Sequence, residues 1–168
     1  THAHIGHYSG LIFFGREVMG SKRIPLYLMP EMENFIRSNG PWSQLVKLRN
    51  VEIKQLKVNK QIDLSNVAIT PFLVPHRDEF SETVGFSIRG PNRKAIFIPD
   101  INKWSEWDQS LIEVVKDSNY VLIDATFYKD GELPGRDMSK IPHPFVTESM
   151  SLLSKLPYRE RGKVWFIH

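Results

Sequence analysis

The chain is 168 residues long, with 22 lysine and arginine residues against 19 aspartate and glutamate residues, a net charge of +3. This length suits one domain with a buried core, and 41% apolar with 24% charged residues is typical of a globular protein. No apolar run approaches the ~18 residues of a membrane-spanning helix. The absence of cysteine excludes disulfides and thiolate metal sites within the chain.

The positive charges are scattered along the sequence. Stretches such as "GSKRI", "KLRN" and "GPNRKA" have acidic residues between them. A nucleic-acid interface requires one clustered basic stripe. The charge pattern therefore favours a solvated surface and makes nucleic acid an unlikely partner.

The first half of the chain predicts alternating helices and strands. Apolar runs ended by glycine or asparagine-glycine are typical of short helices. Alternating or continuous short apolar runs are typical of strands. We expect helices over 10–20 and 31–40, and strands over 24–29, 51–57 and 67–74.

The second half predicts a hairpin followed by strand–helix–strand units. The turn "RGPNRK" joins two strands over 82–90 and 94–100. Ser105 stands at the N-cap position of a helix over 105–118. Further elements are a strand over 120–127, a helix over 145–156 and a strand over 163–168. This order predicts mixed α/β layers, and both ends of the sequence look cut from a longer fold.

Histidines carry the strongest chemical signal. The chain has six: His2, His4, His7, His76, His143 and His168. In an extended segment side chains alternate, so His2 and His4 point to the same side, and His7 follows as the chain turns. Such imidazoles can serve two neighbouring metal positions.

Three further candidates end apolar strands. His76 ends "FLVPH", Asp100 ends "IFIPD" and His168 ends "VWFIH". Strand ends are where α/β proteins place their chemistry. Each residue alone is compatible with an ordinary core, cap or surface role, but the set together favours a metal site.

Several of these stretches resemble the sequence motifs of a known family. "HAHIGH" resembles the H-x-H-x-D-H signature of metallo-β-lactamase-fold hydrolases, and "PHRDEFSETVGFSI", "AIFIPD" and "KVWFIH" resemble its later motifs in order. "LIDATF" and "IPHPFVTESMSLL" resemble the ribonuclease Z branch. "GLIFFGRE" and "VWFIH" are similar to the B protein of pyrroloquinoline quinone biosynthesis. The resemblance implies a four-layer αββα sandwich over 1–168, with its first strands and C-terminal segment missing.

The resemblance also implies a ligand set. His2, His4 and His76 would hold a first metal, Asp100 would bridge, and His7 with His168 would complete a second site. Gly6 departs from the family, whose aspartate there binds the second metal. The second site should therefore be weaker, or served from elsewhere. Zinc is the family's default, while iron or manganese would also suit imidazole and carboxylate ligands.

A proton-donating pair is implied in the same way, with Asp124 orienting His143. The structural alternatives are a strand-end cap for Asp124 and a packing role for His143 between two prolines. Asp78, Glu79 and Glu82 are interpreted as a solvated acidic turn, although one of them could accept a hydrogen bond from a ligand imidazole. Trp104 is interpreted as packing, with substrate stacking as the alternative.

The leading hypothesis is a metal-dependent hydrolase whose metal-activated water attacks a phosphodiester or related ester, with a small molecule or phosphodiester as substrate. The first alternative is an iron-dependent oxygenase similar to the quinone-biosynthesis B protein, motivated by Gly6. The second is a metal-binding or nucleic-acid-binding module without catalysis. The sequence assigns neither an oligomeric state nor a compartment.

Overall fold

The computed structural model describes all residues, 1–168, and divides them into two compact units. Unit 1 comprises Thr1–Lys60 and Asp78–Thr83, and unit 2 comprises Gln61–Arg77 and Val84–His168. The chain thus leaves unit 2 directly after Arg77, adds a short segment to unit 1 and returns at Val84.

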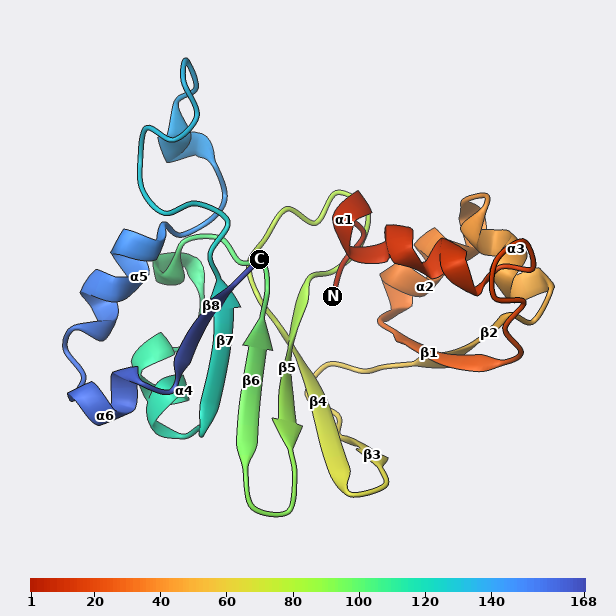
Figure 1. The fold of residues 1–168 in the computed structure, drawn as a ribbon, viewed down its shortest axis with the longest axis horizontal. Coiled ribbons are helices and arrows are strands. Elements are labelled where there is room, and N and C mark those ends of the chain that lie inside the picture. Colours follow the sequence, from red (N-terminus) through yellow and green to blue (C-terminus); the bar gives the residue numbers. More distant parts are fainter. The chain divides into compact units, whose positions relative to one another are not determined.

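Unit 1 is a two-stranded parallel ribbon packed against short helices (Figure 1). Its apolar core includes Ala3, Tyr8 and Ile36, and Tyr8 packs edge-to-face on Trp42 with ring centroids 4.7 Å apart. The elements are α1 (Ile5–Tyr8), the 3₁₀ helix η1 (Ser9–Phe14), β1 (Ile24–Leu28), α2 (Pro30–Ser38), α3 (Trp42–Lys47) and β2 (Val51–Gln55).

Most predictions for this part of the chain are confirmed. The strands expected over 24–29 and 51–57 and the helix over 31–40 correspond to β1, β2 and α2. The helix expected over 10–20 is wrong, because only η1 forms and turns follow it. Gly15, in the middle of this span, opposes a helix, since glycine costs about 1 kcal/mol relative to alanine inside a helix.

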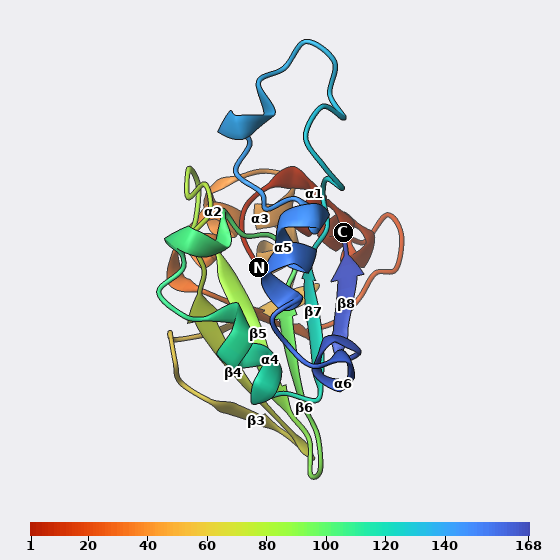
Figure 2. The same cartoon turned by 90° about the vertical axis from the view of Figure 1, so that its left-hand side faces the viewer.

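Unit 2 is a six-stranded sheet covered on one face by helices α4, α5 and α6 (Figures 1 and 2). The strand order is β3-β4-β5-β6-β7-β8, antiparallel from β3 to β6 and parallel from β6 to β8. The strands are β3 (Ile62–Leu64), β4 (Val67–Leu73), β5 (Val84–Arg89), β6 (Lys94–Ile98), β7 (Tyr120–Asp124) and β8 (Val164–Ile167). The helices are α4 (Leu111–Lys116), α5 (Val146–Leu153), α6 (Tyr158–Arg161), and the 3₁₀ turns η2 (Trp104–Glu106) and η3 (Met138–Lys140).

The core of unit 2 lies between the sheet and these helices. Alternate residues of the central strands are buried in it, including Ile98 and Ile123, which are 0% exposed and paired across β6 and β7. Val115 of α4 and Leu153 of α5 pack into the same cluster. The alternation anchors the two central strands, so residues just beyond their ends have fixed positions.

The predicted hairpin is confirmed as β5–β6, and the predicted strands over 67–74, 120–127 and 163–168 as β4, β7 and β8. The helix over 145–156 is confirmed as α5, whereas the helix over 105–118 is wrong in its first half. Ser110, not Ser105, caps α4, accepting the N–H of Glu113. No helix of the structure combines the length and apolar character needed to cross a membrane.

Strand direction determines where the candidate residues lie. Because β4 and β6 are both antiparallel to β5, they run parallel to each other and to β7 and β8. The carboxyl ends of these four strands therefore share one edge of the sheet. Four candidate residues lie at those ends. His76, Asp100 and His168 follow their strands, and Asp124 is the last residue of β7.

Candidate functional site

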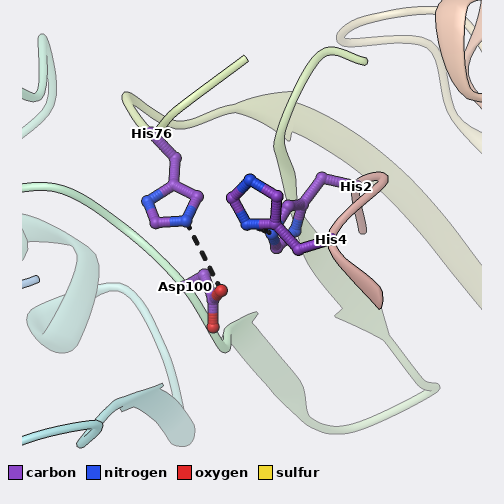
Figure 3. Close-up of side chains that lie close together, drawn as sticks. All are labelled: His2, His4, His76 and Asp100. Carbon is purple, nitrogen blue, oxygen red and sulfur yellow. Dashed lines mark hydrogen bonds and ion pairs between the residues drawn. The ribbon is translucent and has the colours of Figure 1, made fainter. Parts of the chain in front are cut away.

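Asp100 is the centre of the polar cluster at this edge of unit 2. One carboxylate oxygen, Oδ2, lies 3.5 Å from Nε2 of His76, as drawn in Figure 3. The other, Oδ1, lies 3.5 Å from Nε2 of His168. The side chains of His76 and Asp100 are 0% and 4% exposed. Each oxygen of one buried carboxylate thus faces a different imidazole, an arrangement suited to a bridging ligand.

Asp124 and His143 form a direct pair beside this cluster. Nδ1 of His143 lies 2.7 Å from Oδ2 of Asp124, which also accepts the N–H of Ile101 at 3.1 Å. Asp124 is fully buried, at 0% exposure. Because a carboxylate only accepts hydrogen bonds, Nδ1 of His143 carries the ring proton. In the neutral imidazole, Nε2 is then the unprotonated nitrogen.

The other oxygen of Asp124 is held by Thr126, which the sequence interpretation overlooked. Oδ1 accepts the backbone N–H of Thr126 at 2.9 Å and its hydroxyl at 2.7 Å. The same hydroxyl oxygen lies 2.6 Å from Nδ1 of His168. Since the hydroxyl proton goes to Asp124, the oxygen accepts from His168, whose Nε2 lone pair then faces Asp100. The available signal was a threonine two residues after a strand-ending aspartate, a spacing typical of local side-chain turns.

Unit 1 contributes a separate group of histidines. Nε2 of His2 and Nδ1 of His4 are 2.8 Å apart, and Figure 3 draws these two rings together. The rings of His2 and His7 have centroids 4.4 Å apart. His2 is 1% exposed, and its Nδ1 lies 3.1 Å from the hydroxyl of Thr1. The two-residue spacing of His2 and His4 does bring their side chains together, as the sequence predicts.

The acidic residues after His76 show features of both interpretations, because Asp78 and Glu79 are exposed, as in a solvated turn, and one of the three also bonds to a histidine. Glu79 accepts from Nε2 of His4 at 2.9 Å. Glu82 accepts the backbone N–H of Glu31 at 3.0 Å at the start of α2. Asp78 accepts the hydroxyl proton of Thr83 at 3.0 Å, and burial raises the pKa of Asp78. The sequence interpretation missed that this segment folds back onto unit 1.

Gly6 lies in α1, and a Cβ atom added there would meet no atom within 4 Å. A side chain at this position has room.

Trp104 packs against the core of unit 2 and donates from Nε1 to Oγ of Ser149 at 2.8 Å. The packing interpretation of Trp104 is therefore confirmed.

The candidate residues offer donor atoms of the kinds that bind divalent metal ions. Imidazole nitrogens and carboxylate oxygens are ligands for zinc, iron and manganese. In unit 1, ring nitrogens of His2 and His4 converge. In unit 2, the Nε2 atoms of His76 and His168 each lie 3.5 Å from an oxygen of Asp100. Oriented partners behind the imidazoles, such as Glu79 and Thr126, are typical of metal ligands.

Comparison with known families gives the identity of the fold. The profile of the "Beta-lactamase superfamily domain" family matches residues 1–168, the whole chain. The chain belongs to this superfamily. A comparison with curated proteins found no match. Membership supports, at the level of the family, a metal-dependent hydrolase. The predicted α/β fold of the metallo-β-lactamase type is confirmed.

Solved structures with the same fold cover the whole chain. Zn²⁺-bound PqqB from Methylobacterium extorquens is 15% identical with a TM-score of 0.73, and the chain covers 69% of it. YhfI from Bacillus subtilis, described as a metallo-β-lactamase fold protein, is 16% identical with a TM-score of 0.67 and 61% coverage. A diphosphatase from the PhnP family is 18% identical with a TM-score of 0.58 and 66% coverage. The chain thus spans less than two thirds of the length of two of these three.

Proposed function

We propose that the chain forms the metal-binding and proton-donating part of a hydrolase that cleaves a phosphodiester or a related ester. The observation that carries the proposal is the buried Asp124–His143 pair beside Asp100, because a metal ligand and an oriented acid are the two groups that such a cleavage requires. The likeness to a PhnP-family diphosphatase supports phosphorus-ester chemistry over other hydrolytic reactions.

The proposed ligand set is the one that the family resemblance implies. His2, His4 and His76 would hold a first ion, Asp100 would be shared, and His7 and His168 would hold a second, weaker position. When bound, a divalent ion would lower the pKa of a coordinated water toward ~7 and polarise the scissile centre. Zinc is the first candidate, supported by the Zn²⁺-bound PqqB structure, and the donor set also suits iron and manganese.

The residues of unit 2 supply the proton for the leaving group. His143 donates from Nε2 to the departing oxygen, while Asp124 holds Nδ1–H and stabilises the imidazolium before transfer. The N–H of Ile101 and the hydroxyl of Thr126 keep the Asp124 carboxylate in place. These hydrogen bonds orient the pair for the proposed proton transfer.

The test is metal content and turnover in the full-length protein. Elemental analysis should find a bound divalent ion, and the protein should cleave a generic phosphodiester with a rate that a chelator abolishes and metal restores. His76→Ala should lower both metal content and turnover, while Asp108→Asn, an exposed carboxylate far along the chain, should change neither. A protein that binds metal yet cleaves neither esters nor phosphodiesters would refute the hydrolase.

An iron-dependent oxygenase is the second candidate, and Gly6 favours it. A glycine in place of the second-site aspartate leaves open space beside the histidine segment, since a Cβ added at Gly6 would meet no atom within 4 Å. Iron reconstitution without oxygen, followed by oxygen-uptake assays with peptides and small phenols, separates this function from hydrolysis. Absence of oxygen consumption would eliminate it.

A further inference from the structure

Glu79 touches the one imidazole of the H-x-H segment that faces solvent. Its Oε2 lies 2.9 Å from Nε2 of His4, whose side chain is 19% exposed, while that of Glu79 is 46% exposed. We propose that Glu79 is a positioning residue that fixes the tautomer of His4, so that Nδ1 rather than Nε2 is presented to a metal ion. The inference rests on the proposed metal site and concerns residues of unit 1 only.

The location of the ring proton follows from the chemistry of the two partners. A carboxylate accepts hydrogen bonds and does not donate them, so Nε2 of His4 carries the proton directed at Glu79. A neutral imidazole with Nε2–H has its lone pair on Nδ1. That nitrogen lies on the opposite side of the ring, 2.8 Å from Nε2 of His2.

The lone pair of His4 is therefore directed toward the ring nitrogen of its neighbour. Nδ1 of His2 lies 3.1 Å from the hydroxyl of Thr1, a group able to accept its proton. In that state Nε2 of His2 and Nδ1 of His4 would bind one cation between them. The two histidines would thus bind the same ion through different ring nitrogens, Nε2 of His2 and Nδ1 of His4.

Glu79 can perform this role because hydrogen bonds hold its own segment next to the histidines. After Glu79, Ser81 accepts the backbone N–H of Ala3 at 2.9 Å, in a buried hydrogen bond. Before it, Asp78 accepts the hydroxyl proton of Thr83 at 3.0 Å. The loop is thereby held on both sides of the His4 contact, so little conformational entropy is lost in placing Glu79 there.

The expected size of the effect comes from oriented partners of metal ligands in general. Removing such a partner typically weakens metal affinity 10–100-fold, because the ligand samples the wrong tautomer and orientation. Glutamine retains a carbonyl oxygen that accepts from Nε2–H, whereas alanine retains nothing. Glu79→Gln should therefore lie between wild type and Glu79→Ala.

The experiment uses full-length protein with Glu79→Ala, Glu79→Gln and, as the control, Glu82→Gln in the same loop. The first readout is Zn²⁺ affinity, measured by competition with a chromophoric chelator. The second is the His4 tautomer in metal-free protein, read from ¹⁵N shifts of its ring nitrogens. We expect Nε2–H in wild type, a shifted tautomer and 10–100-fold weaker binding in Glu79→Ala, and near wild-type affinity in Glu82→Gln.

Two results would overturn the inference. One is a Glu79→Ala protein that keeps both the tautomer and the affinity of wild type. The other is equal weakening in Glu79→Ala and Glu82→Gln, which would indicate a general loop defect. Since the tautomer is read without metal, a protein that fails to hydrolyse any ester would refute the proposed function while leaving this test valid.

Discussion

Nδ1 of His143 lies 2.7 Å from Oδ2 of Asp124, in a pair whose carboxylate is completely buried. The aspartate is one methylene shorter than the glutamate of the ribonuclease Z branch, and it nevertheless reaches the imidazole directly. It also accepts the N–H of Thr126, as a strand-end cap would. Oδ1 of Asp124 thus forms the strand-end cap, while Oδ2 contacts the imidazole that would donate the proton in the proposed reaction.

The role of the His143 imidazole should be visible in how turnover depends on the leaving group of the substrate. His143→Ala should lower turnover of an alkyl phosphodiester 10²–10⁴-fold, the usual contribution of a positioned general acid. Turnover of a p-nitrophenyl ester should fall far less, because p-nitrophenolate departs without protonation. Steady-state kinetics on the two substrates measures the difference. Equal losses on both, or lost metal in elemental analysis, would argue for a structural or ligand role of His143.

Thr126 should matter through its hydroxyl alone. Thr126→Val removes the group that lies 2.7 Å from Asp124 and 2.6 Å from His168, so both lose an oriented partner. We expect metal affinity at the His168 position to fall 10–100-fold and turnover to fall with it. Thr126→Ser keeps the hydroxyl and serves as the control. Chelator competition checks the prediction, which fails if serine and valine behave alike.

Gly6 should determine how many metal ions bind. We expect full-length wild type to hold one ion tightly, and Gly6→Asp to raise the tight stoichiometry toward two, because the added carboxylate supplies a ligand. A Cβ at this position meets nothing within 4 Å, so the change fits without repacking. Gly6→Ala fills the same space without a carboxylate and should remain at one. Calorimetric titration with Zn²⁺ gives the count, and two tight ions in wild type would contradict the expectation.

The sequence predicted the strand ends well, because apolar runs stopping at His76, Asp100 or His168 are read directly from letter order. Hydrophobic alternation determines where β6 and β7 begin and end, and the chemistry follows one or two residues later. Local signals were sufficient there.

The sequence left open whether an acidic residue after His76 bonds to a histidine, because that depends on contacts between distant segments. The bond between Glu79 and His4 spans 75 positions, and that between Ser81 and Ala3 spans 78. No local propensity encodes such a pairing. The helix expected over 10–20 failed for another reason. The prediction relied on its apolar residues, but no residue of η1 is buried, so no packing offsets the cost of Gly15 inside a helix.

The final prediction concerns the packing that holds the strand ends in place. A Cβ at Gly85 would lie 2.7 Å from the ring of Phe72 and 3.0 Å from the carbonyl oxygen of Phe97. Because Phe72 and Gly85 are paired across β4 and β5, Gly85→Ala must displace the ring or separate the strands. We expect a loss of about 1–3 kcal/mol in the free energy of unfolding, typical of overpacking.

Urea denaturation measures this loss, with Gly162→Ala as the control. Gly162 is exposed, its φ is −64°, and the nearest atom to an added Cβ is a carbonyl oxygen at 3.6 Å, an ordinary contact. That change should alter stability by less than about 0.5 kcal/mol. Equal midpoints for the two variants would mean that Phe72 moves aside freely. The edge of the sheet that carries His76 would then be less firmly held than its burial indicates.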